Sequence, residues 1–238
     1  MNSAAPKPDL LLLPGMMCDE RLWADVAPRL GRSATLHYGD LSRDASIPAM
    51  AARVLKGAPE RFHLGGFSMG GYVAREIVAT APERVQSLIL MNTSSVGSTP
   101  DDVARRRDMA ALFAARPFNG LTTANLKKSV HPDRAGDAAL LDHIQDMARG
   151  LGKDVFMRQL ILEREDGGPS LGSIACPTLV VTCTDDLLRT VEESRTLAVG
   201  IPGARLEIIP DCGHMTPLER PDALGTLIEE WLDTCKAA

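Results

Sequence analysis

A serine at position 68 lies in a pattern that could make its hydroxyl group a nucleophile. Residues 66–70 read Gly-Phe-Ser-Met-Gly; a strand-like run ends just before them, and a segment with helical spacing begins directly behind the serine. A serine on a sharp strand-to-helix turn has an exposed hydroxyl, and Gly66 and Gly70 leave room for the close backbone approach that such a turn requires. The five letters alone also arise by chance. The flanking strand and helix therefore carry the prediction that Ser68 is a nucleophile.

A serine hydroxyl needs a base at neutral pH, and that base needs an orienting carboxylate. In sheets of parallel strands, catalytic groups lie at the carboxyl ends of the strands. His214 fits this requirement, because it lies in a turn, residues 210–215, between the last predicted strand and the last predicted helix. The other histidines lie in predicted strands or in a helical stretch and are interpreted as structural or surface residues: His37, His63, His131 and His143.

The carboxylate is expected where the strand within residues 176–184 ends, because Asp185 and Asp186 follow it directly. Adjacent residues that leave a strand point in different directions, so at most one of the two should face His214. The other is expected to be exposed to solvent or to cap a nearby turn. Spacing alone leaves both aspartates open.

Negative charge on a substrate oxygen has to be stabilised by N–H donors. One donor is expected to be the backbone N–H of Met69, the residue after the serine. The second is expected in the turn after the first predicted strand, residues 14–17, where Met16 is favoured. Both donors belong to the backbone, so the two methionine side chains would line the pocket or pack in the core.

Strand and helix signals alternate along most of the chain. Short apolar or alternating runs predict strands at residues 9–13, 34–38, 62–65, 85–91, 178–183 and 204–209. Helical spacing follows each of them except the fourth, at residues 19–30, 47–56, 69–81, 191–199 and 221–231. Such repeated units with short links predict an α/β fold, a doubly wound and mostly parallel sheet with helices on both faces.

Residues 97–171 break this rhythm, because they show helical spacing and no strand signal. We interpret them as a helical cap inserted into a core of residues 9–96 and 172–238, with residues 1–8 as a disordered tail. Helix breaks are expected at Pro117, Asn119-Gly120, Pro132 and Gly150/Gly152. Apolar cap residues would either pack on the body or line a substrate pocket, and the candidates for the pocket are Phe113, Phe118, Met147 and Met157.

Composition excludes several classes of function. The net charge of the 238 residues is −5, which argues against nucleic acid as the main partner. The hydrophobic fraction of 45% is ordinary for a globular protein. Neither a signal peptide nor a membrane-spanning run is visible, so we expect a cytoplasmic protein that does not bind membranes. A monomer or a homodimer is expected. The five cysteines have no metal-ligand spacing, and nucleotide-binding glycine motifs are absent, so no metal and no cofactor are expected.

Five segments together resemble the α/β-hydrolase superfamily, specifically its small, capped bacterial serine esterase-like members. The matching residues span nearly the whole chain except the predicted cap: 10–16, 65–74, 81–85, 176–181 and 213–221. In this family, the strand that leads to the catalytic acid often has the sequence Pro-Thr-Leu-Val-x-x-Gly-x-x-Asp. Counting from Pro177, this resemblance implies Asp186 as the acid. The chain order Ser, Asp, His is also the order of this family.

The chain departs from the family pattern at three points. Pro14-Gly15 replaces the usual His-Gly of the oxyanion loop, and Cys183 replaces the glycine of the acid strand. Few residues precede the first strand, so the antiparallel strands that commonly open this fold are expected to be missing, which leaves a sheet of about six. Ser68 distinguishes the chain from the haloalkane dehalogenases, which have an aspartate at that turn.

The resulting hypothesis is a serine hydrolase that cleaves a small to medium apolar carboxylic ester, lactone or thioester through an acyl-enzyme. An alternative keeps the catalytic triad but changes the reaction to C–C bond hydrolysis, perhydrolysis, acyl transfer or lyase chemistry. A second alternative is a receptor or binding protein that uses the pocket without turnover.

Overall fold

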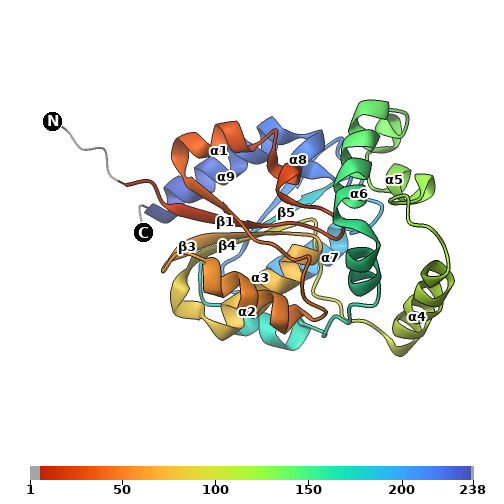
Figure 1. The fold of residues 1–238 in the computed structure, drawn as a ribbon. Helices are drawn as coiled ribbons and strands as arrows, with labels where there is room; N and C mark the ends of the chain where they lie inside the picture. Colours follow the sequence, from red (N-terminus) through yellow and green to blue (C-terminus); the bar gives the residue numbers. More distant parts are fainter. Residues whose placement is uncertain (1–5, 237–238) are drawn as a thin grey trace.

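The computed structural model describes residues 6–236, so the first five residues of the expected N-terminal tail lie outside the described part. Six parallel strands form one sheet in the order β2-β1-β3-β4-β5-β6 (Figure 1). They are β1 (Asp9–Leu13), β2 (Thr35–Tyr38), β3 (Phe62–Phe67), β4 (Val85–Met91), β5 (Thr178–Cys183) and β6 (Arg205–Ile209). All six agree with the apolar runs in the sequence, and the doubly wound α/β fold is confirmed.

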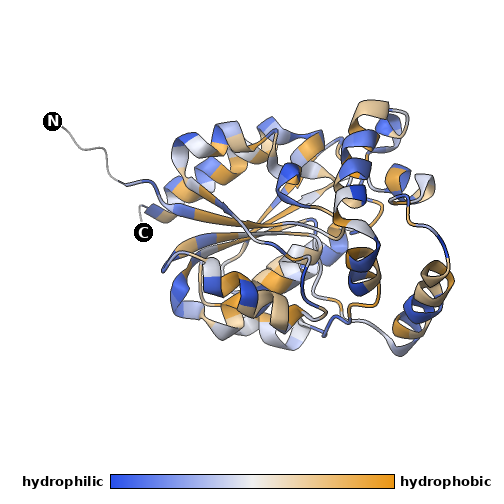
Figure 2. Ribbon diagram, viewed as in Figure 1, coloured by the Kyte–Doolittle hydropathy of each residue, from blue (hydrophilic) through white to orange (hydrophobic). Residues whose placement is uncertain are grey.

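The inner strands are apolar because helices cover both of their faces. Leu10 and Leu12 of β1 pack in a core with α1 (Ala27–Ser33) and α9 (Pro221–Lys236). Leu11 and Leu13 point to the opposite core, with α2 (Ile47–Gly57), α3 (Met69–Thr80) and α7 (Val191–Gly200). Figure 2 shows hydrophobic residues along these inner surfaces and hydrophilic residues on the outer sides of the helices.

The prediction of a single helix over residues 19–30 is wrong. A short 3-10 helix covers Glu20–Trp23, and α1 begins afresh at Ala27. Pro28 explains the break, because a proline lacks the N–H that would continue the helix and is favoured in a first turn. Asp19 caps the start of the short 3-10 helix, since its side chain accepts a hydrogen bond from the Arg21 N–H.

The helical region 97–171 contains α4 (Pro100–Ala114), α5 (Thr123–Lys128) and α6 (Ala138–Leu160), with 3-10 turns at Pro132–Arg134 and Gly168–Ser173. The backbone of α6 is interrupted at Gly152, whose φ of 81° is left-handed, and Gly152 is one of the expected breaks. Figure 1 shows α5 and α6 over one end of the sheet and α4 projecting from the body. None of the helices in residues 6–236 combines the length and apolar character needed to cross a membrane.

Two segments without regular secondary structure join this helical region to the sheet, and their backbones are hydrogen-bonded to each other. We call them the outgoing segment, residues 94–99, and the returning segment, residues 162–167. The Ser98 N–H donates to the Arg164 carbonyl over 2.7 Å, and the Gly167 N–H donates to the Ser95 carbonyl over 2.8 Å. The helical region therefore leaves and rejoins the core at one place.

Candidate active site

Ser68 lies on the turn between β3 and α3 in a strained conformation. Its φ of 50° and ψ of −110° fall outside the regions that side chains with a Cβ normally occupy. The surroundings hold it there: the Ser68 N–H donates to the Met91 carbonyl over 2.9 Å, and its carbonyl accepts from the Thr93 hydroxyl over 2.7 Å. The side chain stays partly exposed although both neighbours are buried.

Gly66 and Gly70 are required for space rather than for backbone conformation. A Cβ on Gly66 would lie 2.6 Å from the Gly70 carbonyl oxygen and 2.8 Å from the Ala74 Cβ. A Cβ on Gly70 would lie 2.5 Å from the Leu13 carbonyl oxygen. The start of α3 thus packs directly on the end of β1, and a side chain at either glycine would push Ser68 out of place.

His214 lies between Ser68 and Asp186. Its Nε2 is 2.9 Å from the Ser68 Oγ, and its Nδ1 is 2.7 Å from an Asp186 carboxylate oxygen. The histidine comes from the loop between β6 and α8 (Thr216–Glu219), is only 5% exposed, and has its ring 5.0 Å from the Phe67 ring. The structure brings the three residues together in a continuous hydrogen-bonded chain.

The two aspartates after β5 have different surroundings. The second oxygen of Asp186 accepts the N–H groups of Leu188 and Arg189 over 2.8 and 2.9 Å, and the side chain is buried. Burial alone would raise the pKa of Asp186, but hydrogen bonds from His214 and from neighbouring N–H groups outweigh it and lower that pKa. Asp185 is half-exposed and contacts the Thr184 hydroxyl and, at 3.5 Å, the His131 ring.

Asn92 was missed in the sequence although it directly follows β4. Its side-chain N–H donates to the His214-bound oxygen of Asp186 over 3.0 Å, and its carbonyl oxygen accepts from the Thr216 hydroxyl over 2.6 Å. The residue is fully buried, with a left-handed φ of 47°. The Cys183 sulfur lies 2.9 Å from the same Thr216 hydroxyl, so the cysteine that replaces the usual glycine joins this network. A polar residue at a strand end was the signal that could have found Asn92.

The turn after β1 lies against Ser68. A Cβ on Gly15 would be 3.4 Å from the Ser68 Cβ and 3.0 Å from the Phe67 ring. Met69 begins α3, so its N–H is among those without an acceptor inside the helix. Gln159 of α6 was missed: its side-chain oxygen accepts the Met17 N–H over 2.8 Å, and its amide donates to the Leu41 carbonyl. This glutamine fixes the turn that contains Met16.

Three of the four pocket candidates gather in one apolar cluster, which also contains the partly buried side chain of Met16. Phe113, Phe118 and Met157 pack there around the ring of Phe156, from which the two phenylalanine rings lie 5.3 and 5.1 Å away. Met147 differs, because it is fully buried in the core beneath α1 and α9. Among residues 6–236, no group of three or more His, Cys, Asp or Glu side chains is placed to hold a metal ion.

Comparison with known proteins decides the family. A model described as "Alpha/beta hydrolase family" matches residues 10–225, nearly the whole length of the chain. The chain belongs to the alpha/beta hydrolase family. The resemblance inferred from the sequence segments is confirmed, and the protein is a hydrolase of this fold.

Similar members of the alpha/beta hydrolase family include two enzymes named pimeloyl-[acyl-carrier protein] methyl ester esterase. The one from Nitrosomonas europaea is 30% identical over 90% of this chain and 92% of its own length. The one from Aromatoleum aromaticum is 27% identical over 94% of this chain and 98% of its own. A 2-hydroxy-6-oxononadienedioate/2-hydroxy-6-oxononatrienedioate hydrolase from Paraburkholderia xenovorans is 28% identical over 79% and 70%.

A solved structure of a thermophilic esterase from Thermogutta terrifontis superimposes with a TM-score of 0.86. It is 25% identical, and the match covers 97% of this chain and 91% of that one. Only 3% of this chain lies outside the match, so most of the helical region 97–171 is included in it.

Proposed function

We propose that the protein is a serine hydrolase that cleaves a small to medium apolar carboxylic ester, lactone or thioester through an acyl-enzyme. The observation that carries this proposal is the hydrogen-bonded chain Ser68–His214–Asp186 on a strained turn, with distances of 2.9 and 2.7 Å. The similarity to enzymes named methyl ester esterase supports an ester as the substrate class.

The reaction follows from the positions of the hydrogen bonds. His214 Nε2 takes the Ser68 proton as the Oγ attacks the carbonyl carbon, and the carbonyl oxygen gains negative charge. Backbone N–H groups of Met69 and Met16 hold that oxygen. The imidazolium then gives its proton to the leaving alcohol or thiol, and water repeats the sequence to release the acid. Asp186 orients His214 and stabilises its positive charge.

The helical region 97–171 is proposed to act as a cap over Ser68. Support comes from Gln159, which ties α6 to the turn at Met17, and from the cluster of Phe113, Phe118 and Met157 beside Met16. These side chains would bind the apolar acyl group. A second candidate is C–C bond hydrolysis at the same serine, which the similarity to a 2-hydroxy-6-oxononadienedioate hydrolase favours.

The decisive experiment is active-site labelling combined with a substrate panel. A fluorophosphonate probe should label Ser68 in folded protein, because an activated serine next to a base reacts with such reagents. Ser68→Ala is the control and should take up no label. A panel of p-nitrophenyl esters and lactones then measures turnover. Absence of label at Ser68 contradicts any serine hydrolase function, and labelling without turnover favours a receptor or C–C chemistry.

A further inference from the structure

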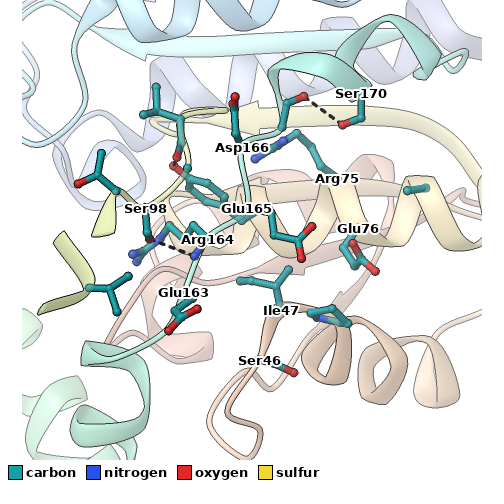
Figure 3. Close-up of a pocket in the computed structure, with 18 residues that line it drawn as sticks. Ser46, Ile47, Arg75, Glu76, Ser98, Glu163, Arg164, Glu165, Asp166 and Ser170 are labelled. Carbon is teal, nitrogen blue, oxygen red and sulfur yellow. Dashed lines mark hydrogen bonds between the residues drawn. The ribbon is translucent and has the colours of Figure 1, made fainter. Parts of the chain in front are cut away.

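A cavity of about 960 Å³ lies beside the outgoing and returning segments, and its lining includes neither Ser68 nor His214. Figure 3 shows Ile47 at the start of α2, Arg75 and Glu76 on α3, and residues 163–166 of the returning segment around it. Its volume is within the range of pockets that bind small molecules. The mechanism proposed for Ser68 gives this cavity no role.

Two guanidinium groups in this cavity stack on one aromatic ring. The Arg75 guanidinium lies 4.9 Å from the centre of the Tyr72 ring, and the Arg164 guanidinium lies 5.4 Å from it. Tyr72 is held in place because its hydroxyl donates to the Val96 carbonyl over 2.9 Å. The ring face attracts a cation, but it does not satisfy the N–H donors of a guanidinium.

The hydrogen-bonding capacity of both arginines is largely unused. Arg75 is only 9% exposed, and one of its terminal nitrogens donates to the Ser94 carbonyl while its buried Nε has no acceptor. Within residues 6–236, the Arg164 side chain has no hydrogen-bonding or ion-pair partner, and its Nε is buried as well. Burial and the nearby charge of Arg106 lower the pKa of Arg164 to about 10. Buried cations without an anionic partner are unfavourable.

Among residues 6–236, none of the carboxylates that line the cavity forms an ion pair with Arg75 or Arg164. Burial lowers the pKa of Arg75, and the nearby charges of Asp166 and Glu76 oppose this only in part. Glu163 pairs instead with Arg107, over 2.9 Å. Glu165 and Asp166 are exposed, and Glu76 is half-buried. Water screens the exposed carboxylates, whereas Arg75 is buried and Arg164 is only partly exposed, so the charges of the arginines are screened less. The unpaired charge in the interior of the cavity is therefore positive.

We propose that this cavity binds an organic anion, with a carboxylate or phosphate group on Arg164 beside Arg75 and an apolar body against Ile47 and Pro48. A planar guanidinium binds such groups through paired N–H donors. Ile47 and Pro48 supply apolar surface at the start of α2. The site is independent of the Ser68 chemistry, so it stands or fails separately from the proposed esterase activity.

The test is calorimetric titration of the Ser68→Ala protein, which removes turnover, in low-salt buffer free of carboxylates and phosphate. Octanoate and octyl phosphate should bind, and octanamide and octylamine should not. Arg164→Gln should weaken octanoate binding at least about tenfold, because a charged hydrogen-bond pair is lost. Arg32→Gln is the matched control, since Arg32 is exposed on α1, across the sheet, and it should leave the affinity unchanged.

A second variant keeps the proposal testable if Arg164→Gln does not fold. Ala79 is an exposed residue of α3 that lines the cavity, and Ala79→Glu would place a carboxylate next to the anion position. It should weaken octanoate binding as strongly as Arg164→Gln. Octanoate binding that both variants leave unchanged, no binding of either anion, or preferential binding of octylamine would each overturn the proposal.

Discussion

Two neighbouring aspartates at the end of β5 provide a direct test of the proposed catalytic roles. Asp186→Asn should lower ester turnover at least about a hundredfold, because the amide cannot stabilise the His214 imidazolium or fix its tautomer. Asp185→Asn should lower turnover less than about tenfold, since a half-exposed carboxylate acts only through screened charge. Steady-state kinetics on a p-nitrophenyl ester compare them. The reverse ranking would assign the orienting role to Asp185.

Asn92 should act as a positioning residue for the acid. Asn92→Leu removes the donor to the Asp186 oxygen that binds His214, and a hydrogen bond to a charged group contributes about 1.5–3 kcal/mol. We expect kcat to fall about tenfold or more with little change in KM. The pKa of Asp186 should rise, so activity should be lost at a higher pH on the acid side of the pH profile.

The exposed Asn125 on α5 supplies the matched control for that experiment. Asn125→Leu should leave kcat and the acid side of the pH profile unchanged. If Asn92→Leu changes only thermal stability and keeps the parental pH profile, Asn92 has a structural role alone.

At the scale of elements, the strands were predictable because helices cover the sheet on both sides. A strand such as β1, whose four leucines are buried, reads as a continuous apolar run. The residues that follow such runs mark the site end of the sheet. Ser68, His214 and the pair Asp185-Asp186 could be found in this way, and the choice of Asp186 within the pair came from the family resemblance. The helix at 19–30 could not, since Pro28 overrides the apolar spacing around it.

The supporting contacts of the site could not be predicted, because they join residues far apart in sequence. Gln159 reaches the turn at Met17 from α6, and buried Glu219 accepts the N–H groups of His131 and Met215 beside His214. Gln159 lies in no recognisable motif, and the matching segment 213–221 contains Glu219 but does not indicate its contact with His131. Helical spacing likewise could not separate Met147, which packs in the main core, from the cluster near Met16.

That difference makes a prediction about the helical region. Phe113→Ala, Phe118→Ala or Met157→Ala should shift the preferred acyl-chain length in at least one case, since a methylene group in an apolar pocket contributes roughly 1 kcal/mol. Met147→Ala should instead lower the free energy of unfolding by about 2–5 kcal/mol and leave the preference unchanged. Relative kcat/KM on esters of increasing chain length measures this. If all of the folded variants keep the parental dependence of kcat/KM on chain length, the helical region does not contact the acyl chain and has a structural role alone.

At the scale of the whole molecule, His63 couples stability to pH. It is buried on β3 with its Nδ1 2.7 Å from the Ser87 Oγ, and burial together with nearby Lys236 lowers its pKa below the ordinary 6.5. The unfolded chain therefore binds a proton at a higher pH than the folded one. The stabilisation from neutral His63 is fully present above pH 6.5 and is lost as the pH falls through the lower, folded value.

Replacing His63 by a residue that does not titrate should reduce the loss of unfolding free energy as the pH falls. The free energy of unfolding in urea should fall less between pH 7.5 and pH 5 for His63→Gln than for the parent protein. His143→Gln on α6 is the control and should keep the parental slope. Equal slopes for the His63→Gln and parent proteins would assign the acid sensitivity to other groups.

The pairing of the outgoing and returning segments has a consequence for how such a protein can diversify. Because the Ser98 N–H donates a hydrogen bond to the Arg164 carbonyl, the two ends of the intervening chain lie next to each other at a fixed position on the core. A replacement stretch whose ends fit there, and which keeps the contacts that Met147 and Gln159 make with the core, would leave the order of the strands unchanged. Recombination or laboratory grafting at this position is expected to change the proposed acyl-binding side chains in one step while the turn that carries Ser68 is retained.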